Sequence, residues 1–145
     1  MKGTKRIGEL LVERGILTPS QVEAALEAQR GTGEFLGKIL IRRGWITEEQ
    51  LLEAFSEQFQ IPRIRMEKEK VDWEAAGQFS IRVLTEHACF PIRQDTASVT
   101  VAISNPLDAW VVEALEKEAK GRSVRLVLAT DAEIRSALHT YLKKR

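Results

Sequence analysis

The chain has 145 residues, of which 43% are hydrophobic and 30% charged, and its formal net charge is +1 at pH 7. This is an ordinary globular composition, long enough for one or two small domains with a real core. The balance of charge gives no support for bulk attraction to nucleic acid or to an acidic surface. A single cysteine excludes an intramolecular disulfide and is typical of a reducing cytoplasm, where we expect this chain.

The sequence contains no pattern typical of a membrane anchor, a metal site or an enzyme. No apolar run reaches the roughly 18 residues of a membrane-spanning helix, and the polar lead 1–5 is no signal peptide. His87 and His139 stand far from a second cysteine, so metal-ligand spacing is absent. The stretch Gly33–Ile39 looks like a phosphate-binding loop, but Ile39 stands where Ser or Thr should bind Mg²⁺. We therefore expect a non-enzymatic protein without metal or cofactor.

A motif of 24 residues occurs twice, as Arg6–Gln29 and as Phe35–Gln58, with equivalent positions 29 residues apart. The two copies share eight identical pairs: Gly8/Gly37, Leu11/Leu40, Arg14/Arg43, Gly15/Gly44, Thr18/Thr47, Gln21/Gln50, Ala25/Ala54 and Gln29/Gln58. Apolar residues recur at i, i+3 and i+4 in both halves of each copy, which predicts amphipathic helices. An internal repeat of this kind indicates two copies of one supersecondary unit.

Each copy is predicted to form a helix, a tight turn and a second helix. Gly15 and Gly44 stand where a helix ends through a left-handed residue. Three residues later, Thr18 and Thr47 begin capping boxes, each with a glutamine at the third helical position. The repeat thus predicts four helices.

Two of the identical residue pairs are not explained by a helical hairpin alone. Gln29 and Gln58 occupy an otherwise apolar face, where an unsatisfied buried amide costs about 1–3 kcal/mol. Gly8 and Gly37 stand in helical patterns, where glycine costs about 1 kcal/mol relative to alanine. Either these residues serve tight packing and local capping, or they allow a ligand to approach the backbone. Trp45 occupies an apolar slot of the second turn, where its ring either packs in the core or lies beside a bound ligand.

The repeat resembles the tandem motif of the MshEN domain, found at the N-terminus of type II secretion and type IV pilus assembly ATPases. In that family, two motifs joined by a five-residue spacer bind cyclic di-GMP, and the spacer here is Arg30–Glu34. Phe35 departs from the family pattern, because the first position of the motif is an arginine, as at Arg6. The resemblance implies a ligand site whose members are Arg6, Ile7, Gly8, Leu11, Gly15, Val22, Leu26, Gln29, Phe35, Leu36, Gly37, Leu40, Gly44, Leu51, Phe55 and Gln58.

The implied function is a cyclic di-GMP sensor that regulates a secretion or pilus ATPase, or an inner-membrane assembly protein, without inserting in the membrane. Arg6 could grip or stack on guanine, and Phe35 in place of arginine would weaken the second half-site. A docking domain that binds no nucleotide is the alternative, and Phe35 favours it. A DNA-reading helix-turn-helix is disfavoured, because the helix over 19–29 carries Glu23 and Glu27 and only one cation, Arg30, at its end, and nucleic-acid affinity comes from cations.

The rest of the chain predicts a small α+β subdomain. We assign 1–62 to the helical repeat, 63–71 to an extended, solvated connector and 72–145 to the subdomain. Short helices are expected over 72–79 and 81–87, and longer ones over 107–120, capped by Asn105, and from Thr130 through Tyr141. Strands over 89–93, 98–103 and 123–129 should form a mixed three-stranded sheet with helices on one face, since a strand–helix–strand unit gives a parallel pair. Pro91 confines its strand to an edge.

Overall fold

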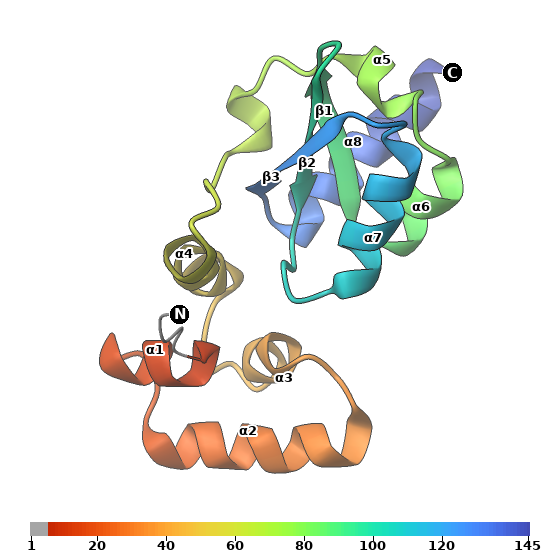
Figure 1. Ribbon diagram of the computed structural model, residues 1–145. Coiled ribbons are helices and arrows are strands. Elements are labelled where there is room, and N and C mark those ends of the chain that lie inside the picture. Colours follow the sequence, from red (N-terminus) through yellow and green to blue (C-terminus); the bar gives the residue numbers. More distant parts are fainter. Residues whose placement is uncertain (1–5) are drawn as a thin grey trace. The chain divides into compact units, whose positions relative to one another are not determined.

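The computed structural model describes residues 6–145, which divide into two compact units that meet between Gln60 and Ile61 in the sequence. The first unit holds the tandem repeat and the second holds the sheet (Figure 1).

The first unit consists of the four predicted helices. They are α1 (Ile7–Glu13), α2 (Pro19–Thr32), α3 (Leu36–Arg42) and α4 (Glu48–Phe59). The two turns have nearly the same backbone conformation at their glycines, with φ of 74° at Gly15 and 76° at Gly44. The N–H of each glycine donates to the carbonyl three residues earlier at 2.9 Å. Glycine is required here because the left-handed region strains other residues.

Both predicted capping boxes are confirmed. Thr18 and Thr47 accept from the backbone N–H of Gln21 and Gln50 at 3.2 and 3.0 Å, and each glutamine accepts back from the threonine N–H at 2.9 Å.

The spacer between the motifs differs from a simple loop. α2 runs through Thr32, so most of the spacer is helical, and the helix ends at Gly33 with φ of 73°.

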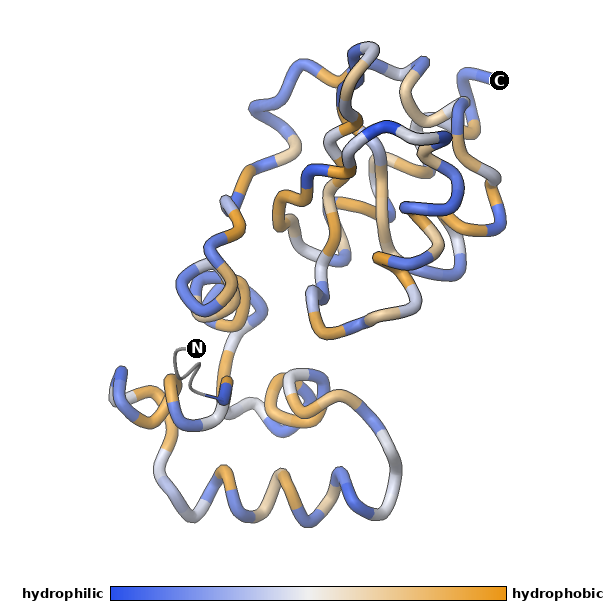
Figure 2. The backbone as a smooth tube through the Cα atoms, in the orientation of Figure 1, coloured by the Kyte–Doolittle hydropathy of each residue, from blue (hydrophilic) through white to orange (hydrophobic). Residues whose placement is uncertain are grey.

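The two copies interlock rather than pack as separate hairpins. α1 contacts α4, and α2 contacts α3. An ion pair between Arg14 of the first copy and Glu57 of the second joins them at the surface. Figure 2 shows hydrophobic and hydrophilic residues alternating along α2, as the amphipathic pattern predicts.

The second unit contains the predicted mixed sheet. Its strands are β1 (Cys89–Gln94), β2 (Ser98–Ile103) and β3 (Ser123–Leu128), in the order β1-β2-β3. β1 runs antiparallel to β2, with an irregularity between Pro91 and Arg93, and β2 runs parallel to β3. Pro91 lies on an edge strand, as predicted, where its missing N–H costs no bond of the sheet interior.

Helices cover both faces of this sheet, so the prediction of helices on one face is wrong. All six residues of the central strand β2 are buried, although alternate side chains point to opposite faces. α7 (Ala109–Glu118) and α8 (Asp131–Lys144) lie on opposite sides of the sheet in Figure 1. α5 (Trp73–Ala76) and α6 (Ile81–Glu86) both contact β1.

The prediction of a helix that starts at Leu107 is also wrong. Asn105 closes a turn by accepting from the N–H of Leu107 at 2.9 Å. The helix begins one turn later, where Asp108 accepts from the N–H of Trp110 at 3.0 Å. With this start of the helix, Leu107 and Trp110 are 43% and 74% exposed.

The stretch after Pro62 is more ordered than the expected solvated connector. The N–H of Leu128 donates to the Pro62 carbonyl at 2.7 Å, and Ile64 donates back to Leu128 at 2.9 Å. A 3₁₀ turn, η1 (Met66–Lys68), follows, and Met66 is buried. These bonds extend the sheet edge beside the end of β3.

Cys89 is fully buried at the start of β1, as the apolar strand pattern predicts. Burial raises the pKa of its thiol to about 12, and the neighbouring carboxylates of Glu118 and Asp108 add to the rise. A thiol held in its neutral form is not a nucleophile. Cys89 therefore belongs to the core and not to a reactive site.

Candidate functional site

The candidate residues of the tandem motif separate into three groups by exposure. Half of them are buried in the first unit: Ile7, Gly8, Leu11, Leu36, Gly37, Leu40, Leu51 and Phe55. Gly15 and Gly44 form the two left-handed turns, and a Cβ added to either would meet no atom within 4 Å. The side chains at the surface or partly exposed are Arg6, Val22, Leu26, Gln29, Phe35 and Gln58. Only this last group presents side chains that a ligand could reach without moving the core.

The two helical glycines make the same contact in both copies. A Cβ added to Gly8 would lie 3.0 Å from Cγ1 of Val22, and one added to Gly37 would lie 2.6 Å from Cδ2 of Leu51. Val22 and Leu51 are equivalent positions of the repeat. Each glycine thus lets the second helix of its own copy pack closely against the first. Of the two interpretations left open by the sequence, close helix packing accounts for both glycines.

Arg6 and Phe35 occupy equivalent backbone positions. Each is the N-cap of the first helix of its copy, with φ/ψ of −70°/154° and −64°/140°. Both side chains are exposed, Phe35 to 39%. A cation and an aromatic ring therefore stand at matching places in the two halves, and the copies meet close by, since Cδ2 of Leu36 lies 3.8 Å from the Cβ position of Gly8.

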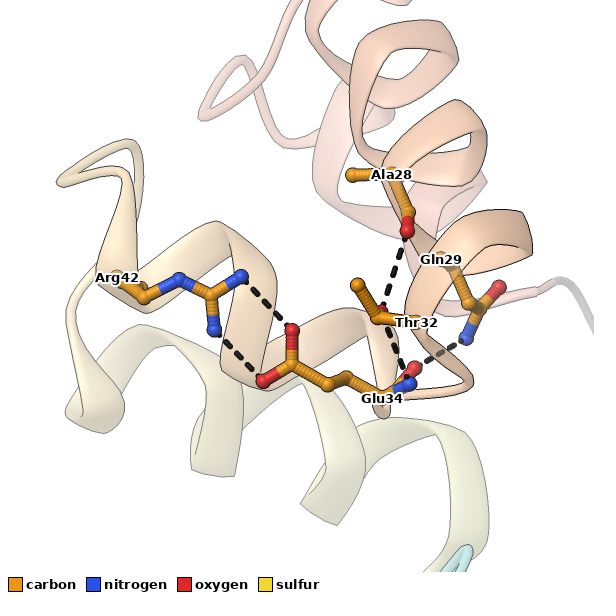
Figure 3. A network of polar contacts seen from close by, with 5 residues as sticks. All are labelled: Ala28, Gln29, Thr32, Glu34 and Arg42. Carbon is orange, nitrogen blue, oxygen red and sulfur yellow. Dashed lines mark hydrogen bonds and ion pairs between the residues drawn. The ribbon is translucent and has the colours of Figure 1, made fainter.

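Gln29 anchors the spacer between the motifs. Its Nε2 donates to the carbonyl of Glu34 at 3.0 Å (Figure 3). Thr32 accepts from the N–H of Glu34 at 3.2 Å and donates to the carbonyl of Ala28 at 3.2 Å. This network fixes the residue directly before Phe35, so it also sets the position from which the ring projects.

A bidentate ion pair completes the network. The guanidinium of Arg42 donates to both carboxylate oxygens of Glu34, at 2.7 and 2.8 Å (Figure 3). The hydrogen bond from Arg42 lowers the pKa of Glu34 below its usual value. Glu34 is therefore ionised at neutral pH and holds the start of α3 against its last turn. Sequence reasoning missed this pair, because the two residues are eight apart and neither is among the positions that are identical in the two copies.

Trp45 is half-buried in the second turn, like Ile16 in the first. The N–H groups of the two residues donate to Leu40 and Leu11 at 3.1 and 3.0 Å. The guanidinium of Arg43 lies 5.4 Å from the centre of the Trp45 ring, a cation–π contact. Trp45 therefore has a packing role that matches its counterpart in the first copy.

One groove involves candidate residues. It has a volume of about 430 Å³ and lies between α1 and the start of α2, lined by Gly8, Glu9, Val12, Glu13, Pro19, Val22 and Glu23. A larger cavity of about 530 Å³ lies in the second unit, between the 66–73 segment and α8. No candidate residue lines the larger cavity, so its size gives it no part in the predicted site.

Within residues 6–145, no group of three or more histidine, cysteine or acidic side chains is placed to hold a metal ion. The helices of the same residues are all too short or too polar to cross a membrane.

The family model of the MshEN domain matches residues 59–145. The chain belongs to the MshEN domain family. The resemblance inferred from the repeat is thereby confirmed, although the matching segment is the second unit together with the last two residues of the first.

The chain also resembles curated proteins along nearly its whole length. It is 29% identical over 136 residues to the type IV pilus assembly ATPase PilB of Myxococcus xanthus, which covers 94% of this chain and 24% of PilB. It is 26% identical over 145 residues to bacteriophage adsorption protein B of Escherichia coli K12, covering 19% of that protein. The chain therefore spans about a quarter or less of these relatives.

Two solved structures have the same fold. The structure of MshE with cdg has a TM-score of 0.86 and 31% identity, and the match covers 94% of this chain and 99% of that one. The N-terminal domain of XpsE has a TM-score of 0.77 at 23% identity and covers 96% of this chain, which supports the fold alone. The predicted α+β class, with a helical repeat before a three-stranded mixed sheet, is confirmed.

Proposed function

We infer that this MshEN domain is a non-enzymatic sensor that binds cyclic di-GMP on its first unit and regulates an attached or partner protein. The observation that carries the proposal is the likeness to MshE with cdg, an abbreviation of cyclic di-GMP, over 94% of the chain. Similarity to a pilus assembly ATPase suggests an ATPase of that kind, or an inner-membrane assembly protein, as the regulated partner. A cytoplasmic location is part of the proposal.

The exposed members of the motif have the chemistry that this ligand needs. A guanidinium such as that of Arg6 can pair with guanine O6 and N7 or lie on the base plane. The ring of Phe35 can stack on the second base, since stacking needs only a π-face. Val22 and Leu26 offer half-buried apolar surface to a base or ribose. The partly exposed amide of Gln29 supplies donors and an acceptor at a polar edge, whereas Oε1 of Gln58 is buried.

Calorimetric titration of cyclic di-GMP into the chain tests the proposal, with GTP, ATP and linear pGpG as controls. We expect selective binding of the cyclic dinucleotide at micromolar affinity or tighter. The absence of both heat and a thermal shift at high ligand concentration would overturn the proposal.

Arg6→Ala should lower the affinity for cyclic di-GMP at least several-fold, because Arg6 is the only cation among the candidate site residues. Phe35→Arg should raise the affinity, because it supplies the arginine that the second copy lacks. Arg30→Ala is the matched control, since Arg30 is an exposed arginine of the same unit that pairs with Glu27. If the Arg6 and Arg30 variants have equal affinities for cyclic di-GMP, Arg6 does not contribute to the binding site.

The regulatory part of the proposal makes a separate prediction. If the ligand changes the affinity for a partner, the partner must change the affinity for the ligand by the same factor. Titrations of a PilB-type ATPase with and without saturating cyclic di-GMP measure the first factor. Equal partner affinities in both titrations would leave ligand binding intact and refute the coupling.

A protein-docking domain without nucleotide binding is the second candidate. The side chains of Leu107 and Trp110 favour it, because an apolar side chain exposed to 74%, next to another exposed to 43%, is typical of a contact surface. A photo-crosslinking amino acid in place of Trp110 should capture a secretion or pilus assembly protein in cells. The same amino acid at Glu116, an exposed position, is the control. If position 110 captures no such protein, like the control position, the result argues against a docking surface at Trp110.

A further inference from the structure

The two halves of the candidate site differ in the side chain at the first position of the motif. Arg6 holds this position in the first copy and Phe35 in the second, and both side chains are exposed. Every other pair of candidate residues is identical in the two copies or apolar in both. A ligand with two equal halves would therefore meet a cation at one end of the site and an aromatic ring at the other.

A side chain such as that of Arg6 distinguishes guanine from adenine. A guanidinium carries only donors, and guanine offers it two acceptors on one edge, O6 and N7. In adenine the amino group N6, a donor, replaces O6. Donor then faces donor, and one of the two hydrogen bonds is lost. The half of the site at Arg6 therefore favours guanine by at least about tenfold.

Phe35 makes no such distinction. Its ring has neither a donor nor an acceptor, and stacking on a ring needs only the π-face that both purines have. The side chain is 39% exposed, so part of it packs on the protein and the rest is open to a base. The half of the site at Phe35 therefore selects for a flat base and not for guanine.

Gln29 supplies an acceptor beside this ring. Its Nε2 donates to the carbonyl of Glu34 at 3.0 Å, and that carbonyl belongs to the peptide bond that leads to Phe35. A carbonyl oxygen only accepts, so the amide nitrogen must face it and Oε1 points away (Figure 3). Both purines carry an amino group that can donate to an amide oxygen, N2 in guanine and N6 in adenine. Gln29 therefore serves either base.

We propose, on the basis of the proposed function, that Arg6 selects guanine whereas the half of the site at Phe35 accepts guanine or adenine. The chain then binds the mixed cyclic dinucleotide, cyclic GMP–AMP, nearly as tightly as cyclic di-GMP. The riboses and phosphates of the two ligands are the same, so only the base at Phe35 differs. The mixed ligand places guanine at Arg6 in one orientation and cyclic di-GMP does so in both, which makes the mixed ligand about twofold weaker.

Calorimetric titrations of the full chain with cyclic di-GMP, cyclic GMP–AMP of the same linkages and cyclic di-AMP test the proposal. The mixed ligand should bind within about fivefold of cyclic di-GMP, and cyclic di-AMP should bind at least about tenfold more weakly than cyclic di-GMP. A larger loss for the mixed ligand overturns the proposal and leaves the cyclic di-GMP sensor intact. Cyclic di-AMP as tight as cyclic di-GMP also overturns it. Binding of none of the three refutes the sensor itself.

Variants at the two positions should change this selectivity in opposite ways. Phe35→Arg gives the second half a guanine-selective side chain, so cyclic GMP–AMP should become at least about tenfold weaker than cyclic di-GMP. Phe35→Leu is the matched control, because it removes the ring without adding a donor and should weaken both ligands by the same factor. An unchanged ratio in Phe35→Arg overturns the proposal.

Arg6→Ala gives a second test, which stays valid should Phe35→Arg fail to fold. Without the guanidinium neither half of the site selects guanine, so cyclic di-AMP should bind this variant within about fivefold of cyclic di-GMP. Arg6→Ala that keeps the wild-type preference for cyclic di-GMP over cyclic di-AMP overturns the role of Arg6 in base selection.

Discussion

At the scale of single residues, Gly8 and Gly37 make the same helix–helix contact in the two copies, but the space beside each glycine differs. The Cβ position of Gly37 lies 2.6 Å from Leu51, a buried side chain, whereas that of Gly8 lies 3.0 Å from half-buried Val22. The second copy is therefore packed more tightly against its glycine. The contact explains why glycine, a poor helix former, stands at both positions.

Gly37→Ala should lower the free energy of unfolding by about 1–2 kcal/mol, because overpacking outweighs the gain in helix propensity. Gly8→Ala should change it by less than about 1 kcal/mol, since a smaller movement of Val22 accommodates the methyl group. Urea unfolding followed by circular dichroism measures both. Leu51→Val, which copies the first motif, should relieve the Gly37→Ala variant, and a double-mutant cycle without coupling between these two positions would contradict the proposed contact.

At the scale of elements, helix ends are set by side chains that satisfy free backbone N–H groups. Thr18, Thr47 and Thr130 each open a helix through a reciprocal capping box. The sequence predicted the boxes at Thr18 and Thr47 and the start of a helix at Thr130. It failed at α7, because Asn105 and Asp108 are both good caps three residues apart, and the structure uses Asn105 for a turn.

Thr47→Ala should cost about 1 kcal/mol of stability, because the N–H of Gln50 loses its acceptor. Thr47→Ser keeps the hydroxyl and serves as the control, with an expected loss of a few tenths of a kcal/mol at most. The midpoint of urea unfolding distinguishes the two. Equal losses in both variants would show that the methyl group of Thr47, and not its cap, contributes the stability.

At the scale of the whole molecule, each unit has its own core, and the stretch after Gln60 is bonded to the second. Glu133 of α8 accepts from the N–H of Met66 at 2.9 Å and from Arg63 at 2.8 Å. Burial alone would raise the pKa of Glu133, but the hydrogen bonds from Thr130, Met66 and Arg63 outweigh it and lower the pKa. This carboxylate ties the entry segment of the second unit to its last helix.

The lowered pKa makes stability depend on pH in a defined direction. The unfolded chain takes up the proton first, so the contribution of Glu133 is present above its ordinary pKa and is lost as the pH falls through the lowered value. Glu133→Gln should be less stable near neutral pH and should lose less stability between about pH 6 and pH 3. Urea unfolding across this range, with exposed Glu116→Gln as control, measures the difference. Parallel pH profiles for wild type and Glu133→Gln would contradict this role.

Residues 61–145 should fold without the helical repeat, because their sheet, helices and entry segment are bonded to one another. We expect a fragment of these residues to unfold in one cooperative transition. Buried Cys89 should react with a thiol reagent only after that transition. A fragment without a transition, or one whose thiol reacts at once, would show that the second unit depends on the first.

The sequence by itself determined the repeat, its helices, turns and caps, because these follow from local spacing and from backbone conformations open mainly to glycine. It also determined the mixed sheet, since a strand–helix–strand unit gives a parallel pair. Only the tertiary structure decided that half of the candidate residues are core, that helices cover both sheet faces, and that Gln29, Glu34 and Arg42 form one network. Exposure and such networks depend on which surfaces meet across the chain, and residues distant in sequence carry no local signal of their meeting.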